Sequence, residues 1–265
     1  MLDTYRTSFN ISENSEPTLA LLTVLIQQHL KNFTFSSINV LLNKPLPLLP
    51  HAIESRFMAG EGGYCFEHNK LFYLLLLDLG YDVTSYLGRV LLNLERDVPK
   101  THRLNIVTIE GVSYLVDVGF GPYSPASPIK LSDEETLCAT GMSYNISASA
   151  NGELSLNLLK DRGPFVLYRF ERSYYNEEDY ELAHFYSHQH PKANFVKNLV
   201  VSSQKDGVVY ALINSTFQVI TETKPTVTEV TSQVQLREIL ETYFNYDLEK
   251  VALEVLFTVL ERSKK

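Results

Sequence analysis

The chain has few cysteines, no long apolar run and no excess of basic residues. These absences argue against a disulfide-rich fold, a membrane-spanning segment and nucleic-acid binding. Its 265 residues include two cysteines, so it can form one disulfide at most. The formal net charge of −8 argues against sequence-independent nucleic-acid binding, because such binding depends on Lys and Arg neutralising phosphates. The longest apolar run near Cys65, Leu71–Leu77, is far too short to span a bilayer. We therefore expect no nucleic-acid partner and no membrane segment.

The first twenty residues also lack the basic segment followed by an apolar one that marks a secretory signal. This favours a reducing cytoplasm, where a cysteine is catalytic, metal-bound or merely buried. Cys138, in "DEETLCATG", has no suggestive neighbours, and we interpret it as a bystander.

The hydrophobic pattern predicts helices, then strands, then a mixture of both, which is an α+β chain. A helix is expected in "EPTLALLTVLIQQHLKNF", with Pro17 in its first turn, and another over Glu67–Leu79, closed by Gly80. Short β-rich segments from Tyr81 to about residue 185 predict an antiparallel barrel or sandwich. Strands around an Asp-Gly turn follow, and then helices in "SQVQLREILETYF" and "DLEKVALEVLFTVLERSKK".

The stretch "GEGGYC" turns the chain sharply just before Cys65, since glycine adopts backbone conformations with positive φ. It lacks the G-K-[ST] of a phosphate-binding loop and the G-x-G-x-x-G spacing of a dinucleotide site. The turn places Cys65 at the start of the expected helix, where unpaired N–H groups and the helix dipole favour a thiolate. The alternative is a small, half-buried cysteine that only packs against the helix.

The segment "THRLNIVTIEGVSYLVDVGFG" predicts a hairpin of Arg103–Ile109 and Val112–Val118 with a two-residue Glu-Gly turn. In that register His102 and Asp117 become diagonal neighbours on one face, roughly 7–8 Å apart at the backbone. Local geometry can thus bring an imidazole beside a carboxylate. A surface pair without function is the alternative, and a one-residue slip would separate the two side chains.

Together these residues form a candidate nucleophile, base and orienting group. Cys65 supplies the sulfur, His102 takes its proton, and Asp117 fixes the imidazole tautomer and stabilises the imidazolium.

The motifs "GGYCFEHN", "THRLNIV" and "LVDVGFG" resemble the three active-site motifs of the arylamine N-acetyltransferases, and their spacing resembles that family's. The resemblance continues through "PTLALLTVLIQQHLKNFTFSSINVLL", "FYSHQHPKANFVKNLVVS" and "LREILETYFNYDL". It implies a papain-like Cys-His-Asp arrangement in a three-part fold. The parts expected are an N-terminal helical bundle over 1–82, a central antiparallel β-barrel over 83–185 and a C-terminal α/β lid over 186–265.

The resemblance also implies ping-pong transfer of an acetyl group from acetyl-CoA, a co-substrate, to an arylamine or arylhydrazine through acetyl-Cys65, as in xenobiotic metabolism. No metal is implied. By analogy Thr101, Gly119, Phe120 and Gly121 lie on the coenzyme side of the cleft. The backbone N–H groups of Cys65 and of a residue near Thr101 are the expected oxyanion donors. Phe120 serves equally well as an aromatic packed in the barrel.

The chain departs from the family pattern at Glu61, which stands where the family has arginine, and at "FSS", where the family has Phe-Glu-Asn. If that arginine and glutamate pair, both have changed here, which is better tolerated than losing one. A carboxylate close to Cys65 would disfavour the thiolate and lower or alter activity. The partner of Glu61, Arg56 or another basic group, stays open.

Other functions remain open. A Cys-His-Asp set also serves papain-like proteases and transglutaminases, and amide synthases or other thioester-dependent acyltransferases share the family fold. Glu61 also makes a non-catalytic binding descendant plausible. The cluster "HFYSHQH", with His184, His188 and His190, suggests metal only weakly, because no cysteine or carboxylate stands at ligand spacing around it.

Overall fold

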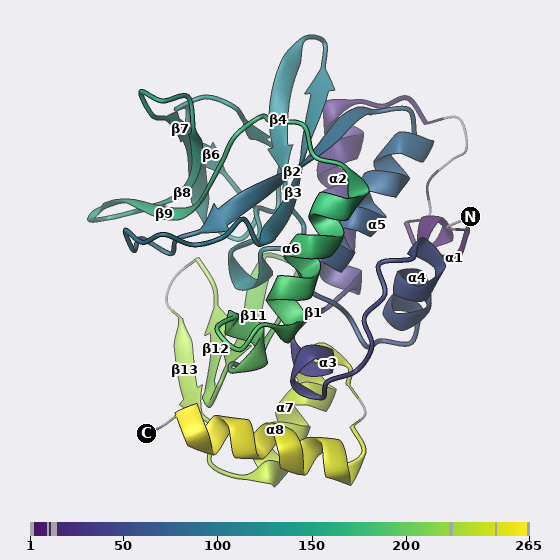
Figure 1. Cartoon of the computed structure of the whole chain (residues 1–265), viewed down its shortest axis with the longest axis vertical. Helices are drawn as coiled ribbons and strands as arrows, with labels where there is room; N and C mark the ends of the chain where they lie inside the picture. The colour runs from purple at the N-terminus through teal and green to yellow at the C-terminus, as the bar shows by residue number, and fades with distance from the viewer. Residues whose placement is uncertain (1–2, 10, 12–14, 223–224, 247, 264–265) are drawn as a thin grey trace.

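Helices form the N-terminal part of the chain in the computed structural model, which describes residues 3–9, 11, 15–222, 225–246 and 248–263 (Figure 1). Most of them pack beside a strongly curved sheet, and a second sheet with two further helices lies at the other end of the molecule. The helices before the first long strand are α1 (Asp3–Thr7), α2 (Leu19–Asn32), α3 (Ile38–Leu41), α4 (Pro50–Met58) and α5 (Cys65–Asp78).

The ends of α2 and α5 follow from local hydrogen bonds. Thr18 is the N-cap of α2, because its hydroxyl accepts from the Leu21 N–H, so Pro17 lies before the helix and not in its first turn as predicted. Helix α5 begins at Cys65, two residues earlier than predicted. It ends before Gly80, whose φ of +79° confirms the predicted glycine stop.

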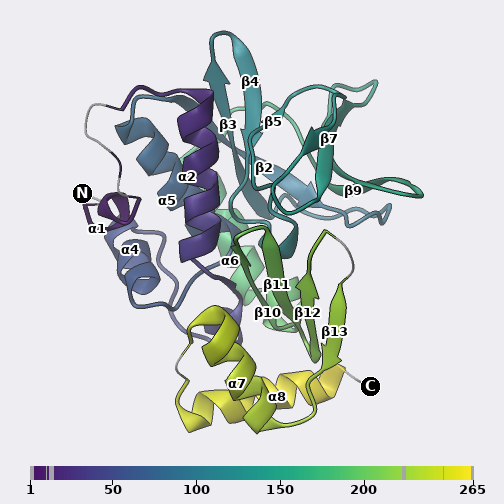
Figure 2. The same ribbon diagram turned by 180° about the vertical axis from the view of Figure 1, so that it is seen from behind.

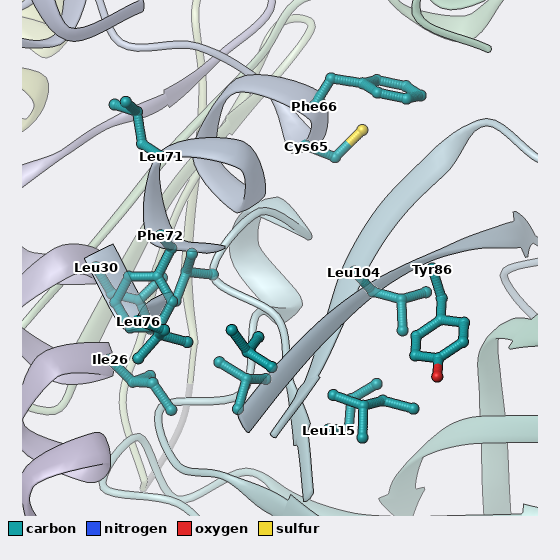
Figure 3. Close-up of a cluster of buried hydrophobic side chains, with 14 of the residues drawn as sticks. Ile26, Leu30, Cys65, Phe66, Leu71, Phe72, Leu76, Tyr86, Leu104 and Leu115 are labelled. Atoms are coloured by element: carbon teal, nitrogen blue, oxygen red, sulfur yellow. The ribbon is translucent and has the colours of Figure 1, made fainter. Parts of the chain in front are cut away.

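Helix α5 packs between α2 and the barrel. Figure 3 shows Phe72 and Leu76 of α5 beside Ile26 and Leu30 of α2, all of them buried. Burying each such side chain stabilises the fold by roughly 1.5–3 kcal/mol. This packing fixes the helix that begins at Cys65 against its neighbours.

A chain of polar groups crosses this apolar region. His68 Nε2 donates to the Thr34 carbonyl oxygen at 3.2 Å, so its Nδ1 accepts from His29 Nε2 at 2.7 Å. The Tyr5 hydroxyl completes the chain by donating to His29 Nδ1 at 2.6 Å. Both imidazoles are therefore neutral and fully engaged, and burial lowers the pKa of His68 to about 4.

Within the described residues, eight antiparallel strands form the curved sheet in the order β5-β4-β3-β2-β9-β8-β7-β6. The Ile146 N–H of β7 donates to the Ser132 carbonyl oxygen just after β5, so the two ends of the sheet approach and the barrel nearly closes. The strands are β2 (Asp82–Val90), β3 (His102–Ile109), β4 (Val112–Val116), β5 (Ile129–Lys130), β6 (Thr136–Leu137), β7 (Ser143–Ala148), β8 (Leu154–Lys160) and β9 (Gly163–Phe170).

The β3–β4 hairpin has the predicted register. Ile109 pairs with Val112 and Asn105 with Val116, and both turn residues have positive φ, +50° at Glu110 and +79° at Gly111. This confirmed register holds the start of β3 beside the chain that leaves β4.

The second sheet has the order β1-β10-β11-β12-β13 and packs against α7 and α8 (Figures 1 and 2). At its edge, β1 comes from the N-terminal part of the chain and pairs with β10. The expected last helix reaches residues 247 and 264–265, which lie outside the described residues. The elements are β1 (Phe35–Ser36), β10 (Val200–Lys205), β11 (Val208–Ile213), β12 (Thr216–Ile220), β13 (Thr226–Glu229), α7 (Gln233–Phe244) and α8 (Lys250–Ser263).

The sequence pattern did not predict helix α6. Residues Glu177–Gln189 form α6, whereas we expected strands to continue to about residue 185. A capping box between Asn176 and Asp179 starts this helix, and its mostly polar surface gave no strong apolar period. The α+β class is confirmed, and the barrel replaces the sandwich alternative. The division at residues 82 and 185 stays a prediction.

Candidate active site

Cys65 lies at the first position of α5, where the chain passes very close to other segments. Gly62 has φ +63°, and a Cβ there would lie 2.2 Å from the Thr34 carbonyl oxygen, so no other residue fits. The Tyr64 N–H donates to Glu67 Oε2 at 3.1 Å and closes the first turn of the helix. The result is a buried thiol whose Sγ lies 3.7 Å from the Thr101 carbonyl oxygen.

His102 and Asp117 form a buried pair. Nε2 of His102 lies 2.6 Å from Asp117 Oδ2, so Nδ1 is the nitrogen left for Cys65. Burial alone lowers the pKa of His102, but Asp117 and a hydrogen bond to Cys65 outweigh it and raise the pKa to about 10. The site therefore favours a protonated imidazole between two acidic groups.

Asp117 is held by three further donors. Its Oδ1 accepts from Asn69 Nδ2 at 2.8 Å and from the Gly119 N–H at 3.0 Å, and its Oδ2 accepts from the Tyr168 hydroxyl at 2.9 Å. Burial raises the pKa of this carboxyl, yet His102, Asn69 and Gly119 together hold it below its usual value. The carboxylate form is thus stabilised at neutral pH.

Sequence reasoning missed Asn69 and Tyr168. Asn69 follows Cys65 by four residues, a spacing that puts both on one helix face, so its position was a usable signal. Tyr168 comes from β9, far along the chain, and no local pattern points to it.

Of the four residues expected on the coenzyme side, Thr101, Gly119 and Phe120 lie beside Cys65 or His102. The Thr101 N–H donates to the Gly88 carbonyl oxygen, so this N–H is not available to an oxyanion. A Cβ on Gly119 would lie 2.9 Å from Cys65 Cα, so this glycine is needed for the contact between its loop and α5. The Phe120 ring stands edge-on to the His102 ring, with centroids 4.9 Å apart. Gly121 has φ +69° and begins the short 3-10 helix η1 (Gly121–Tyr123).

Glu61 does not form an ion pair with Arg56. Its Oε2 accepts from Asn39 Nδ2 at 3.1 Å and lies 3.4 Å from Lys44 Nζ, with 38% of the side chain exposed. Arg56 instead pairs with the buried Glu67 at 2.5 Å. The candidate partner Arg56 was therefore wrong, and Lys44 is the basic group that faces Glu61.

His184 and His188 form hydrogen bonds with backbone carbonyl oxygens, and neither cysteine forms a disulfide. His184 Nε2 donates to the Leu46 carbonyl oxygen at 2.7 Å and its Nδ1 accepts from Tyr64, while His188 Nδ1 lies 2.7 Å from the His184 carbonyl oxygen. Across the described ranges, no group of three or more His, Cys, Asp or Glu residues gathers as a metal site. Both Cys65 and Cys138 are free thiols, and burial raises the pKa of Cys138. No helix in the described part of the chain is long and apolar enough to cross a bilayer.

Comparison with known proteins identifies the family. The family model described as N-acetyltransferase matches residues 18–253. The arylamine N-acetyltransferase of Mycobacterium tuberculosis is 33% identical over 208 residues, which cover 76% of this chain and 73% of that protein. The chain belongs to the arylamine N-acetyltransferase family.

Solved structures of arylamine N-acetyltransferases share the fold. The enzyme from M. tuberculosis superposes with a TM-score of 0.88 at 28% identity, covering 97% of this chain and 99% of that one. The Mycobacterium marinum enzyme in complex with CoA gives a TM-score of 0.86 at 24% identity and covers 99% of both chains. Membership in the arylamine N-acetyltransferase family, which the three motifs predicted, is confirmed, and so is the prediction of an acyltransferase enzyme.

Proposed function

We propose that the protein moves an acetyl group from acetyl-CoA to an arylamine or arylhydrazine by a ping-pong mechanism with Cys65 as nucleophile. The observation that carries this proposal is the position of His102, whose Nε2 lies 2.6 Å from Asp117 Oδ2 and whose Nδ1 is left for Cys65. That arrangement is what a cysteine nucleophile and its base require.

In the first half-reaction, the Cys65 sulfur attacks the thioester carbonyl and its proton passes to His102. The bond between the acetyl carbon and the coenzyme sulfur breaks, and CoA leaves with the proton from His102. In the second half-reaction, the amine nitrogen attacks acetyl-Cys65 and releases its proton to His102, and the Cys65 sulfur leaves. Asp117 keeps the imidazole oriented and stabilises its charge in both halves.

The Cys65 N–H, one of the unpaired donors at the start of α5, is the proposed oxyanion donor. Thr101, Gly119, Phe120 and Gly121 are proposed to face the coenzyme, since their loops border Cys65 and His102. The M. marinum relative binds CoA on the same fold. A role in xenobiotic metabolism and a location in the cytoplasm, where the free Cys65 stays reduced, belong to the same proposal.

An amide synthase is the second candidate, because family membership does not determine which amine accepts the acyl group. The binding-descendant alternative loses its basis, since the Glu61 carboxylate is paired with Lys44 and partly exposed.

Mass spectrometry after incubation with acetyl-CoA and no acceptor tests the proposal. We expect one acetyl group on Cys65, which an arylamine then removes. Cys138→Ala keeps the adduct and Cys65→Ala loses it, because Cys138 is a buried thiol outside the site. A folded protein that takes up no acetyl group would refute the mechanism. An adduct that no arylamine or arylhydrazine removes would favour the amide synthase.

A further inference from the structure

Helix α6 carries no residue of the proposed mechanism, yet it lies beside α5, the helix that begins at Cys65 (Figure 1). Lys70 of α5 pairs with Glu177 in the first turn of α6 at 2.6 Å. Tyr180 and His184 lie on the buried face of α6. They are four residues apart, so they stand about one turn apart on the same side of the helix.

His184 holds the residue that precedes the nucleophile. The Tyr64 hydroxyl donates to His184 Nδ1 at 2.6 Å, and His184 Nε2 donates in turn to the Leu46 carbonyl oxygen at 2.7 Å. The Tyr64 and His184 rings also stack, with their centroids 5.6 Å apart. Burial lowers the pKa of His184 to about 3, so Nδ1 is an unprotonated acceptor at neutral pH. Because Tyr64 is the N-cap of α5, this contact holds the backbone from which Cys65 starts.

Tyr180 holds Arg103, the residue that follows the proposed base. The Arg103 guanidinium, only 1% exposed, lies 4.2 Å from the centroid of the Tyr180 ring, and the Tyr180 hydroxyl donates to the Ser85 carbonyl oxygen at 2.7 Å. Among the described residues, Nε and Nη1 of Arg103 have no hydrogen-bond partner, while Nη2 donates to Ser85 Oγ at 3.2 Å and lies 3.9 Å from the exposed Glu177 carboxylate. Burying a cation with so few hydrogen bonds is unfavourable, so the aromatic face of Tyr180 is an important part of what holds Arg103.

These two contacts bear on one distance. Cys65 belongs to α5 and His102 to β3, so the distance between them depends on how the two elements are held together. Helix α6 contacts the neighbour of each, from adjacent turns of one rigid element. A misplacement of about 1 Å between reacting groups can cost roughly 100-fold in rate.

We propose that Tyr180 and His184 are positioning residues, which hold Cys65 and His102 at the distance that proton transfer requires. The inference rests on the proposed function, in which His102 takes the Cys65 proton. Neither residue touches the reacting atoms, because each acts through the neighbour of a catalytic residue.

Alkylation by iodoacetamide reports whether the Cys65 thiol and His102 are in contact. An ordinary thiol reacts roughly 200-fold more slowly at pH 6 than at pH 9, because only the thiolate is nucleophilic. We expect the unaltered site to lose less than about tenfold, since a thiolate–imidazolium pair persists at pH 6. Cys138→Ala is the background for every measurement, so that Cys65 is the one thiol left to react.

Two variants test the contacts separately. His184→Phe keeps a ring but removes both hydrogen bonds of the imidazole, and Tyr180→Leu removes the aromatic face from Arg103. In each we expect the fall in alkylation rate from pH 9 to pH 6 to grow at least about fivefold. Neither altered residue titrates in this range, because burial raises the pKa of Tyr180 and lowers that of His184 to about 3. A changed ratio therefore reports the contact between Cys65 and His102.

The kinetics of acetylation give a second readout. At saturating acetyl-CoA, the rate of Cys65 acetylation should fall roughly tenfold in both variants, with the half-saturating concentration unchanged within about threefold, because only the step that needs the contact is slowed. His184→Gln, whose amide can both donate and accept, should recover part of the loss.

Tyr186→Phe is the matched control on the same helix, because the half-buried Tyr186 ring stacks on His190, with centroids 4.3 Å apart. It should keep the ratio of the unaltered protein. Tyr64→Phe removes the hydrogen bond to His184 from the other side and should match His184→Phe, which keeps the test decisive if one of the two does not fold. Circular dichroism checks the folding of every variant.

The outcomes separate this inference from the proposed function. Folded variants that keep the small pH ratio of an activated Cys65 would refute the positioning role alone. An unaltered protein whose Cys65 reacts as an ordinary thiol would refute the proposed mechanism, and the positioning role with it.

Discussion

The side-chain amide of Asn69 donates to Asp117 Oδ1 at 2.8 Å and to the carbonyl oxygen of Arg103 at 2.6 Å. Its Oδ1 accepts from the Val118 N–H at 3.1 Å. One residue of α5 therefore holds β3, which begins at His102, together with the chain that leaves β4 at Asp117. Because Cys65 begins the same helix, Asn69 sets the spacing between the thiol and its proposed base.

We expect Asn69→Ala to lower kcat/KM by about 10- to 100-fold and the free energy of unfolding by about 2–4 kcal/mol, because three buried partners lose a hydrogen bond. Steady-state kinetics and urea denaturation measure the two effects. Lys70→Ala is the matched control, since Lys70 pairs with the exposed Glu177 and its loss should cost less than about 1 kcal/mol. Equal effects of the two variants would contradict the positioning role.

The His102–Asp117 pair predicts a loss of stability at high pH. The pKa of His102 is raised from 6.5 to about 10 in the folded protein. Its contribution is therefore complete below pH 6.5 and is lost as pH rises through about 10. Thermal unfolding between pH 7 and 10 should fall more steeply for the unaltered protein than for His102→Gln. Parallel curves would show that His102 is not protonated in the fold.

The buried His29–His68 pair predicts a loss of stability in acid. Burial lowers the pKa of His68 from 6.5 to about 4, so the unfolded chain binds its proton first as pH falls. The stability is complete above about pH 6.5 and is lost towards pH 4, by about 2 kcal/mol at pH 5 for this one group. Urea denaturation of His68→Gln at pH 8 and pH 5 should show a smaller difference than the unaltered protein does.

The exposed His51 provides the control for that acid effect. His51→Gln should leave the difference between pH 8 and pH 5 unchanged, because the His51 side chain is exposed on α4 and takes no part in the hydrogen bonds of His29 and His68. If His51→Gln and His68→Gln changed the stability difference between pH 8 and pH 5 equally, the acid sensitivity would not come from the buried His68.

The surroundings of Glu61 predict that its carboxylate has little influence on Cys65. Glu61→Gln should change kcat/KM by less than about threefold, since the side chain is partly exposed and paired with Lys44. Glu67→Gln is the contrasting variant. It leaves Arg56 without its buried partner and should cost about 2–4 kcal/mol of unfolding free energy. A large rise in activity for Glu61→Gln would restore the expectation that Glu61 disfavours the thiolate.

The sequence predicted the structural features that depend on residues close to one another along the chain. The β3–β4 register follows from the turn and from strand alternation, so the approach of His102 to Asp117 could be read before the fold was known. The helix start at Cys65 was misplaced by two residues only, because the Tyr64–Glu67 hydrogen bond that sets it is local.

Contacts between distant segments could not be read in this way. Tyr168 reaches Asp117 from β9, and Lys44 reaches Glu61 from the loop after α3, through packing that no periodicity encodes. Helix α6 was missed because it buries few apolar side chains, so its helical period is weak.

The pairing of β1 with β10 also bears on the order in which the chain folds. Phe35 pairs with Ser202, more than 150 residues later, whereas the strands of the β3–β4 and β7–β8–β9 hairpins are close in sequence. Closing a long loop has a larger entropic cost, so the hairpins form before the edge strand is captured. During synthesis, residues 35–36 stay an open edge until β10 has left the ribosome. The glycine turn that presents Cys65 lies beside that edge, since Gly63 pairs with Phe35, so we expect the nucleophile to reach its final position late, when the last third of the chain docks.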